Sequence, residues 1–373
     1  MILERLTLNN FKNYRQADIG LCGNVNCFVG NNGAGKTNLL DAAYYLSFCK
    51  SYFNPVDSQN IRLGEDFFAI HGHYSGLSSS DSENEDTVSV ILKRGQNKQV
   101  RWNKKVYKTL AEHIGKIPLV MVSPNDQQLI TGGSDLRRKF VDGVISQTDR
   151  AYLDHLIHYN KALEQRNRLL KQMWDDRLWD EAMLAVWDLQ LVSHGEFIYQ
   201  SRSRFVAAFA PLFEEYYHWI VGGDEPGSIV YCRNEDPLQI QLEDCRRSDR
   251  YSQYTNAGPH KDDIQLLLTQ DFPLKKFGSQ GQQKSFALAL KLAQFQYLLD
   301  HSGTKPILLL DDIFDKLDLP RIKQLIALVG SERFGQVLLT DTQPGRVQAI
   351  FDELPTLEHR IFQVQNGTIT LNS

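Results

Sequence analysis

The sequence lacks the features of several large protein classes. It contains no apolar run close to the roughly 20 residues that a membrane-spanning helix needs, and it shows no internal repeat. Its five cysteines have no metal-ligand spacing, and their odd number argues against a disulfide framework, so we expect a reduced, cytoplasmic protein without a membrane partner. The formal net charge is −4, which excludes a globally basic nucleic-acid binder. Any contact with nucleic acid must come from a local basic patch.

What the chain does contain is a strand-rich beginning, a helical middle and a strand-rich end. Apolar residues recur at helical spacing over 149–171 and 179–220, where Gly195 and Pro211 interrupt the second stretch. Strand patterns occupy 2–8, 24–29, 88–92, 99–102, 262–269, 306–310 and 336–340, and a final hairpin is expected over 362–369. The acidic, low-complexity segment 75–86 is expected to be a loop.

This order predicts an α/β fold with a mixed sheet and an inserted all-helical lobe. The lobe is expected over 148–250, because strand patterns resume after it. The segments 1–147 and 251–373 would then form the two parts of one head domain.

A glycine-rich element follows the predicted strand 24–29. It reads Gly30-Asn31-Asn32-Gly33-Ala34-Gly35-Lys36-Thr37, which fits the phosphate-binding P-loop pattern. A helix is predicted to begin at Lys36, and Asn38 continues the element into it. The glycines let backbone N–H groups curl around phosphates, Lys36 reaches the β- and γ-phosphates, and the Thr37 hydroxyl can ligate Mg²⁺. The element therefore predicts a site for ATP and Mg²⁺, with a glycine-rich structural turn as the alternative.

The fully apolar strand 307–310 ends in two carboxylates, Asp311 and Asp312. A strand buried on both faces has this composition, and α/β folds bind ligands at the carboxyl ends of such strands. We expect Asp311 to complete the Mg²⁺ shell, while Asp312 polarises the attacking water and acts with Lys36 in catalysis. An acidic turn after a buried strand is common, so this assignment depends on its pairing with the P-loop.

Most of the chain separates the P-loop from this acidic strand. Small nucleotide kinases and GTPases place the two motifs closer together, and the guanine-reading Asn-Lys-x-Asp pattern is absent, since Asn160-Lys161 continues as Ala-Leu. A long insertion between the two halves is typical of ABC ATPases with a role in DNA repair.

The segment Gly278–Lys284 opens a predicted helix, 285–299. Its core, Ser279-Gln280-Gly281-Gln282, resembles the ABC signature Leu-Ser-Gly-Gly-Gln, with Gly278 in place of the leucine and Gln280 in place of the first glycine. A serine hydroxyl and bare N–H groups at a helix N-terminus form an anion site. In ABC proteins this segment meets the γ-phosphate held by the other subunit, which implies an ATP-dependent homodimer. A polar helix start is the plainer alternative.

Two further positions bear on this resemblance to ABC proteins. Lys316-Leu317-Asp318 resembles the short loop that crosses the dimer interface, with Asp318 as its acidic residue. The strand 336–340 ends in Thr340-Asp341-Thr342, where transporters and many relatives carry a histidine that senses the γ-phosphate.

Nearly the whole chain resembles the RecF family of bacterial recombinational-repair proteins. Besides the ATPase motifs, the resemblance is carried in the family's order by Asn10-Phe11-Lys12-Asn13-Tyr14, the stretch 33–41, Ser123–Asp126, Arg137–Asp142, Gly258–Asp263 and Leu309–Asp312. The chain departs from the family at Phe53-Asn54, where an arginine is common, so no nucleotide contact by that arginine is carried over.

The resemblance implies an ATP-driven dimer that binds double-stranded and gapped DNA. It implies work with RecR and RecO in loading recombinase at single-strand gaps. Two features agree with this implication. The segment 148–250 is far too short for the coiled-coil arms of SMC or Rad50 proteins, and Asp312 stands where fast ABC ATPases carry glutamate. A carboxylate one methylene shorter holds the water less well, which predicts a slow ATPase used as a conformational switch.

Two basic stretches are candidate DNA contacts. The first, 93–108, contains Trp102 and Tyr107 among its lysines and arginines and no acidic residue. Its alternative is the solvated face of a hairpin that turns near Asn103. The second stretch begins at Arg137. The candidate residues are Lys98, Arg101, Lys104, Lys105, Arg137 and Arg138.

Other protein classes fit less well. A transporter nucleotide-binding subunit would carry its signature much closer to the P-loop. A nuclease-fused ABC protein would need a further acidic metal cluster, for which we expect no room after 362–369. A purely structural DNA-binding protein would not need Lys36, Asp311 and Ser279 together.

Overall fold

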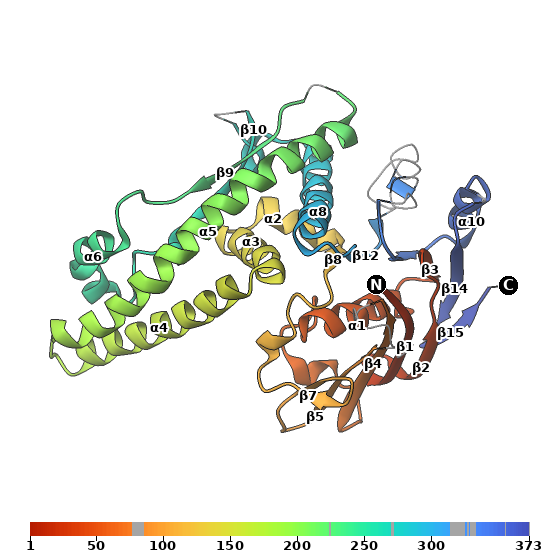
Figure 1. The fold of residues 1–373 in the computed structure, drawn as a ribbon, viewed down its shortest axis with the longest axis horizontal. Coiled ribbons are helices and arrows are strands. Elements are labelled where there is room, and N and C mark those ends of the chain that lie inside the picture. Colours follow the sequence, from red (N-terminus) through yellow and green to blue (C-terminus); the bar gives the residue numbers. More distant parts are fainter. Residues whose placement is uncertain are drawn as a thin grey trace. The chain divides into compact units, whose positions relative to one another are not determined.

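The structure, a computed structural model, describes residues 1–76, 86–223, 225–269, 272–313, 325, 326, 328, 333–354 and 356–372. It forms two compact units, unit 1 (Met1–Asp126 and Gln294–Ser373) and unit 2 (Gln127–Ala293). These limits differ from the predicted 1–147, 148–250 and 251–373. The helix that precedes residue 148 and the strand that follows residue 250 pack with helices of unit 2 instead of a head sheet. Figure 1 colours the chain along its sequence.

The first sheet of unit 1 is antiparallel and six-stranded. Its strands are β1 (Ile2–Phe11), β2 (Tyr14–Gly20), β4 (Phe67–Ser75), β5 (Asp86–Lys93), β6 (Gln99–Trp102) and β7 (Lys105–Val106). The strand order is β2-β1-β4-β5-β6-β7, so β7 is an edge strand. Burial alternates along β5, since one face packs on the core and the other does not.

The second sheet of unit 1 is also six-stranded and mixed. Its strands are β3 (Val25–Val29), β8 (Leu119–Val122), β12 (Ile307–Leu310), β13 (Val337–Asp341), β14 (His359–Gln365) and β15 (Thr368–Leu371), in the order β15-β14-β3-β13-β12-β8. All pairings are parallel except the predicted β14–β15 hairpin. Every residue of β3, β8, β12 and β13 is buried, which explains why β8 and β12 are apolar throughout.

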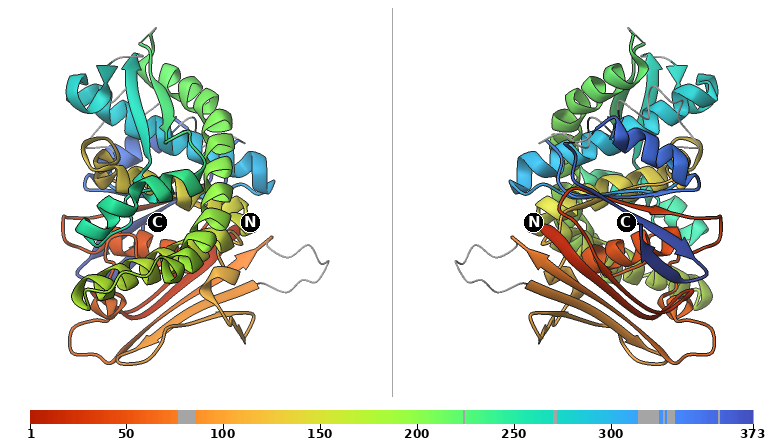
Figure 2. Two further views of the ribbon diagram at one scale, coloured as in Figure 1. Left: turned by 90° about the vertical axis from the view of Figure 1, so that its left-hand side faces the viewer. Right: turned by 90° about the vertical axis from the view of Figure 1, so that its right-hand side faces the viewer.

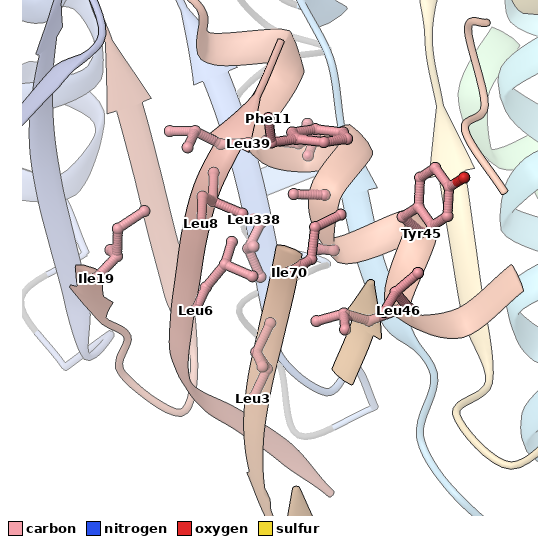
Figure 3. Packing of buried hydrophobic residues seen from close by; sticks show 14 of the residues in the cluster. Leu3, Leu6, Leu8, Phe11, Ile19, Leu39, Tyr45, Leu46, Ile70 and Leu338 are labelled. Atoms are coloured by element: carbon pink, nitrogen blue, oxygen red, sulfur yellow. The ribbon is translucent and has the colours of Figure 1, made fainter. Parts of the chain in front are cut away.

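Helix α1 (Lys36–Phe48) begins at the residue predicted from the sequence. One apolar cluster joins it to both sheets, and Figure 3 shows Leu6 of β1, Ile70 of β4, Leu46 of α1 and Leu338 of β13 within that cluster. The cluster therefore fixes α1 and the loop before it relative to both sheets. Unit 1 also contains the helical elements η1 (Asp57–Asn60), η2 (Leu110–Glu112), η3 (Pro124–Gln127) and α10 (Pro344–Asp352).

Unit 2 is mainly helical. Its helices are α2 (Gln128–Thr131), α3 (Ser134–Thr148), α4 (Arg150–Asp175), α5 (Glu181–Val221), α6 (Leu238–Ser252), η4 (Pro259–Lys261), α7 (Leu274–Phe277) and most of α8 (Gln280–Ser302). The long helices α4 and α5 run beside each other, as Figures 1 and 2 show. Each begins at an aspartate, Asp149 or Asp180, whose side chain accepts backbone N–H bonds.

The structure differs from the predicted helical lobe in two respects. Within 148–250 it contains a strand, β9 (Ser228–Cys232), which pairs with β10 (Asp263–Thr269), and β11 (Phe272–Pro273) completes a three-stranded sheet. The sequence of β9, Ser-Ile-Val-Tyr-Cys, is rich in β-branched and aromatic residues. Neither Gly195 nor Pro211 interrupts α5. A Cβ on Gly195 would lie 2.4 Å from a Leu238 methyl carbon, so glycine permits the close packing of α5 against α6.

Two predicted segments fall wholly or partly outside the described residues. These are the loop 75–86, of which 77–85 are not described, and the interface loop with Asp318. Within the ranges that the structure does describe, no helix combines the length and the apolar character needed to cross a bilayer.

Candidate functional site

The P-loop connects the end of β3 to the start of α1, and its glycines are required by close backbone contacts. A Cβ on Gly30 would lie 2.2 Å from the Val364 carbonyl oxygen. Gly35 has a φ of 112°, and its Cβ would lie 2.3 Å from the side-chain nitrogen of Asn13. No other residue type fits either position without moving β14 or Asn13.

The side chains of Asn13 and Tyr14, which are not part of the P-loop, form hydrogen bonds to it. The Asn13 amide donates to the Ala34 carbonyl oxygen at 3.1 Å and accepts from the Asn38 amide at 2.7 Å. The Tyr14 hydroxyl donates to the Gly35 carbonyl oxygen at 3.0 Å. These two roles were not predicted from the sequence, although both residues lie in the Asn-Phe-Lys-Asn-Tyr stretch that resembles the family.

The Lys36 side chain is buried against the P-loop. Its ammonium donates to the carbonyl oxygens of Gly30 at 2.8 Å and Asn31 at 3.1 Å. Helix α1, all of whose residues are described, has no side-chain cap and no acidic residue in its first turn. Asn31, Asn32 and Gly33 are exposed. The loop therefore presents a cation and the N–H groups of a helix N-terminus to an anion.

The acidic strand meets the P-loop because of the strand order. β3, β13 and β12 are neighbours and parallel, so their carboxyl ends lie at one edge of the sheet. At this edge the Thr37 hydroxyl donates to an Asp311 carboxylate oxygen at 2.8 Å. The two predicted Mg²⁺ ligands are thus brought together from distant parts of the sequence.

Thr340, at the end of the intervening strand β13, links both carboxylate residues. Its buried hydroxyl donates to the same oxygen of Asp311 at 2.9 Å and accepts from the Asp312 backbone N–H at 2.9 Å. Asp312 has a φ of +44°, an unusual conformation for a residue other than glycine. This linkage was not predicted from the sequence, where Thr340-Asp341-Thr342 stood out only for lacking the histidine of many relatives.

The next residue of β13, Asp341, forms an ion pair and accepts a hydrogen bond. Its carboxylate forms a two-pronged ion pair with Arg346, one contact of which is 3.0 Å, and it accepts from the Thr342 backbone N–H at 2.6 Å. Asp341 therefore braces the start of α10.

The donor set fits a hard divalent cation. Burial raises the pKa of Asp311 to about 6, and the hydrogen bonds from Thr37 and Thr340 partly oppose this rise. A buried carboxylate beside a hydroxyl offers the oxygen ligands that Mg²⁺ prefers, and a cation there would offset the cost of burying the negative charge. Asp311 and Thr37 are the residues that could hold it.

The signature segment lies in unit 2, at the start of α8. Ser279 accepts a hydrogen bond from the Gln282 backbone N–H at 3.1 Å, and the Gln282 side chain accepts from the Ser279 N–H at 2.8 Å. These reciprocal bonds form a capping box, which accounts for the Ser-x-x-Gln spacing in purely structural terms. Ser279, Gln280 and Gly281 are exposed, so the same helix start also presents its donors outward.

The predicted DNA contacts divide into paired and exposed residues. Lys98 forms an ion pair with Asp57 at 2.6 Å and its side chain is only 10% exposed, so we remove it from the candidates. Arg137 is removed for the same reason, because it forms two hydrogen bonds to Asp263 at 2.8 and 2.9 Å. Arg138 donates to Ser134 at 2.7 Å and to a backbone carbonyl of residue 262.

The other three candidates, Arg101, Lys104 and Lys105, lie on the hairpin considered for 93–108, which the structure contains as β6 and β7. Arg101 is partly buried and donates to Gln99 at 3.0 Å, whereas Lys104 and Lys105 are exposed. The two lysines are therefore the residues of the predicted set that are best placed for phosphate contact.

Comparisons with known proteins agree over the length of the chain. A model of the RecF/RecN/SMC N-terminal domain matches residues 2–370. The DNA replication and repair protein RecF of Phocaeicola vulgatus is 48% identical over 99% of this chain and 98% of its own length. The protein of the same name from Bacteroides fragilis strain YCH46 is 45% identical, with the same two coverages.

Solved structures are similar as well. One described as the recombination mediator protein RecF-ATP in the RecFOR pathway has a TM-score of 0.89 at 28% identity, covering 100% of this chain and 98% of that chain. An Smc head bound to the C-winged helix domain of ScpA has a TM-score of 0.59 at 16% identity, covering 100% of this chain and 97% of that one, which shows a shared fold only. By motif, fold and sequence, the chain belongs to the RecF family.

Proposed function

We propose that this chain is an ATP-dependent DNA-binding switch of recombinational repair, in which two copies complete the ATP sites. The observation that carries the proposal is the hydrogen bond between Thr37 and Asp311, which unites the P-loop and the acidic strand in one site. A relative of similar fold is described as RecF-ATP, which supports ATP as the ligand.

Each residue of the site has a distinct part in this proposal. The N–H groups of the loop 30–35 and the Lys36 ammonium bind the phosphates. Thr37 and Asp311 would hold Mg²⁺, which would neutralise phosphate charge as the bond to the γ-phosphate breaks. Asp312 orients and polarises the attacking water.

Slow hydrolysis follows from the catalytic carboxylate. Aspartate at position 312 is one methylene shorter than glutamate, and its backbone is held in a left-handed conformation with its N–H bonded to Thr340. The shorter side chain reaches the attacking water less well, so we expect a slow timer instead of a motor.

Dimerisation would supply the signature from a second copy. In the capping box the Ser279 oxygen acts as an acceptor, which leaves its proton available to donate to a γ-phosphate. The exposed start of α8 would add N–H donors where negative charge is greatest. ATP would then join the two copies, and hydrolysis would release them.

DNA binding and the protein partners complete the proposal. Lys104 and Lys105 on the β6–β7 hairpin would contact phosphates of double-stranded or gapped DNA, with Arg101 beside them. A relative of similar fold is described as a recombination mediator in the RecFOR pathway, which supports a cytoplasmic role with RecR and RecO in loading recombinase at single-strand gaps.

The experiment that tests this function is sizing of the protein with ADP, with ATP, and with ATP plus a gapped duplex, beside ATP turnover under the same conditions. We expect a monomer with ADP, a dimer with ATP, slow turnover, and a DNA-bound dimer in the third sample. DNA binding that is indifferent to ATP, with no hydrolysis above a Lys36→Ala control, would instead make the chain a structural DNA-binding protein.

A further inference from the structure

A pocket lies beside the β6–β7 hairpin of unit 1, and none of the ATPase residues lines it. Its volume is about 400 Å³, within the usual range for small-ligand sites. The pocket has two aromatic side chains, Trp102 and Tyr107, and its basic lining residues are Lys105, Lys108 and Lys116.

The hairpin that carries the pocket is held firmly on the sheet. Its two-residue turn, Asn103-Lys104, has positive φ angles of 46° and 71°, which matches the twist of the flanking strands. The Asn103 side chain donates to Asp86 at 2.6 Å and accepts from the Thr87 N–H at 2.7 Å. These bonds tie the turn to β5, so Trp102 and Lys105 start from fixed backbone positions.

The aromatic wall is backed by a buried histidine. The His113 Nε2 lies 2.6 Å from the Leu46 carbonyl oxygen, and because a carbonyl can only accept, Nε2 carries the proton. Nδ1 is then the acceptor, and it lies 3.4 Å from the Tyr107 hydroxyl. The ring centroids of Tyr107 and Trp102 lie 5.4 and 6.0 Å from that of His113. The core thus orients both rings.

Positive charge surrounds these rings. The Lys116 ammonium lies 5.2 Å from the Trp102 ring centroid and 4.9 Å from that of Tyr107. Lys105 and Lys108 are exposed at the same pocket. The acidic lining residue, Glu112, is engaged by the backbone N–H and hydroxyl of Thr109, each at 3.1 Å. The pocket therefore favours a ligand that is both aromatic and anionic.

We propose that this pocket binds an unpaired nucleotide of a DNA strand, with the base against Trp102 and Tyr107 and its phosphates near Lys105 and Lys108. The proposal rests on the DNA-binding role proposed above and names the part of the DNA that the hairpin contacts. In a duplex the faces of the bases are covered by stacking, whereas an unpaired base offers an open face to an aromatic ring. The Lys116 ammonium, which now covers the rings, would move to a phosphate as the base enters.

The test is equilibrium binding of the full chain, with ATP and Mg²⁺, to three labelled probes: a blunt duplex, the same duplex with a single-strand gap, and an oligothymidylate. We expect Trp102→Leu to weaken binding of the gapped and single-stranded probes by about tenfold, and to leave the blunt duplex within about twofold. Trp102→Phe, which keeps a stacking face, should retain most of the affinity. Lys108→Glu should also weaken both probes, whereas Lys161→Glu on α4 serves as a control of equal charge change.

A second measurement does not depend on variants. An oligothymidylate that carries 5-iodouracil should form a photocrosslink to a residue within 102–107. Excess unlabelled oligomer should suppress this crosslink, whereas excess free thymidine monophosphate should not. Suppression by the monophosphate at equal nucleotide concentration would instead identify a free-nucleotide site. Equal losses of all three probes in Trp102→Leu, or crosslinks confined to other segments, would overturn the proposal. If the wild-type chain bound none of the probes, the proposed DNA-binding function itself would fail.

Discussion

The Thr37 hydroxyl donates a 2.8 Å hydrogen bond to Asp311, a residue 274 positions further along the chain. The contact exists because β13 lies between β3 and β12 and all three strands run in parallel, so the P-loop and the acidic strand end at one edge. The two motifs therefore need not be close in sequence to form one site. This arrangement lets the chain carry unit 2 within its ATPase fold.

Lys36→Ala should abolish ATP binding. The side chain now donates to two carbonyl oxygens of the loop, and in the ATP complex its charge would move to the β- and γ-phosphates. We expect nucleotide affinity to fall by about two orders of magnitude, since bonds to charged groups are the strong ones. Calorimetric titration with ATP measures this, with Lys161→Ala as the control. Unchanged affinity would rule out the assigned phosphate site.

Asp312→Asn should bind ATP with nearly unchanged affinity and hydrolyse it about 100-fold more slowly, because an amide polarises water poorly. Dimers with ATP should then accumulate. Asp311→Asn is the matched comparison, since it should weaken the Mg²⁺ dependence of binding as well as turnover. Single-turnover hydrolysis beside sizing distinguishes the two variants. Full activity in Asp312→Asn would move the water-activating role to another residue.

Thr340→Val should lower the turnover rate while ATP affinity changes little. Valine has nearly the same shape but lacks the hydroxyl that joins Asp311 to the Asp312 backbone. Without it the carboxylate of residue 312 loses its fixed position, and we expect about a tenfold loss in kcat. Thr340→Ser should restore most of the rate, because it retains the hydroxyl. A valine variant with a raised KM and a normal kcat would assign Thr340 to nucleotide binding instead of positioning.

His113 should make stability depend on pH. Burial, with a smaller effect of Lys116, lowers the pKa of His113 to about 4, so the unfolded chain binds a proton more readily than the folded one. The free energy of unfolding should therefore decrease as the pH falls from about 6.5, the usual pKa of a histidine, towards 4. Between about pH 7.5 and about pH 5.5 this loss should be about 1 kcal/mol.

His113→Gln is the variant that measures the contribution, because glutamine can keep a donor for the Leu46 carbonyl oxygen but does not titrate. Urea unfolding at both pH values should show a smaller pH effect in the variant than in the wild-type chain. An identical pH effect in both proteins would mean that folding does not lower the pKa of His113. His260, whose pKa burial also lowers to about 4, remains in both proteins and accounts for a shared part of the loss.

The sequence was sufficient for the parts of the fold whose patterns are local. The P-loop, the start of α1 and the fully apolar strand β12 were each predicted from a few adjacent residues. The strand β9 was missed, because it is short and lies between long helices. The limits of unit 2 were also not predicted, since they depend on packing between segments that are distant in sequence.

The polar network of the site was harder to predict than its motifs. Nothing in the sequence indicates that Thr340 bonds to Asp311, because this depends on the order of strands within the sheet. Charge alone was also misleading for Lys98 and Arg137, which have acidic partners far away in the chain. Lys104, in contrast, lies in the hairpin turn and is exposed, as a solvated turn position predicts.

The central claim, a site completed by two copies, is tested most directly through Ser279. Ser279→Arg should leave ATP binding by the monomer nearly intact, because the residue lies on the helix start of unit 2 and not in the P-loop. It should block ATP-dependent dimerisation and hydrolysis, since a bulky cation cannot fit a closed interface. Lys36→Ala, in contrast, should lose affinity for ATP already as a monomer.

The decisive measurement is ATP turnover of an equal mixture of Ser279→Arg and Lys36→Ala, beside the nucleotide affinity of each variant alone. The mixed dimer holds one intact composite site, from the P-loop of the first variant and the signature of the second, so turnover should return to at most about one quarter of the wild-type rate. Each variant alone should remain inactive. If Ser279→Arg alone lost ATP affinity as severely as Lys36→Ala, or hydrolysed ATP normally as a monomer, the shared-site account would be contradicted.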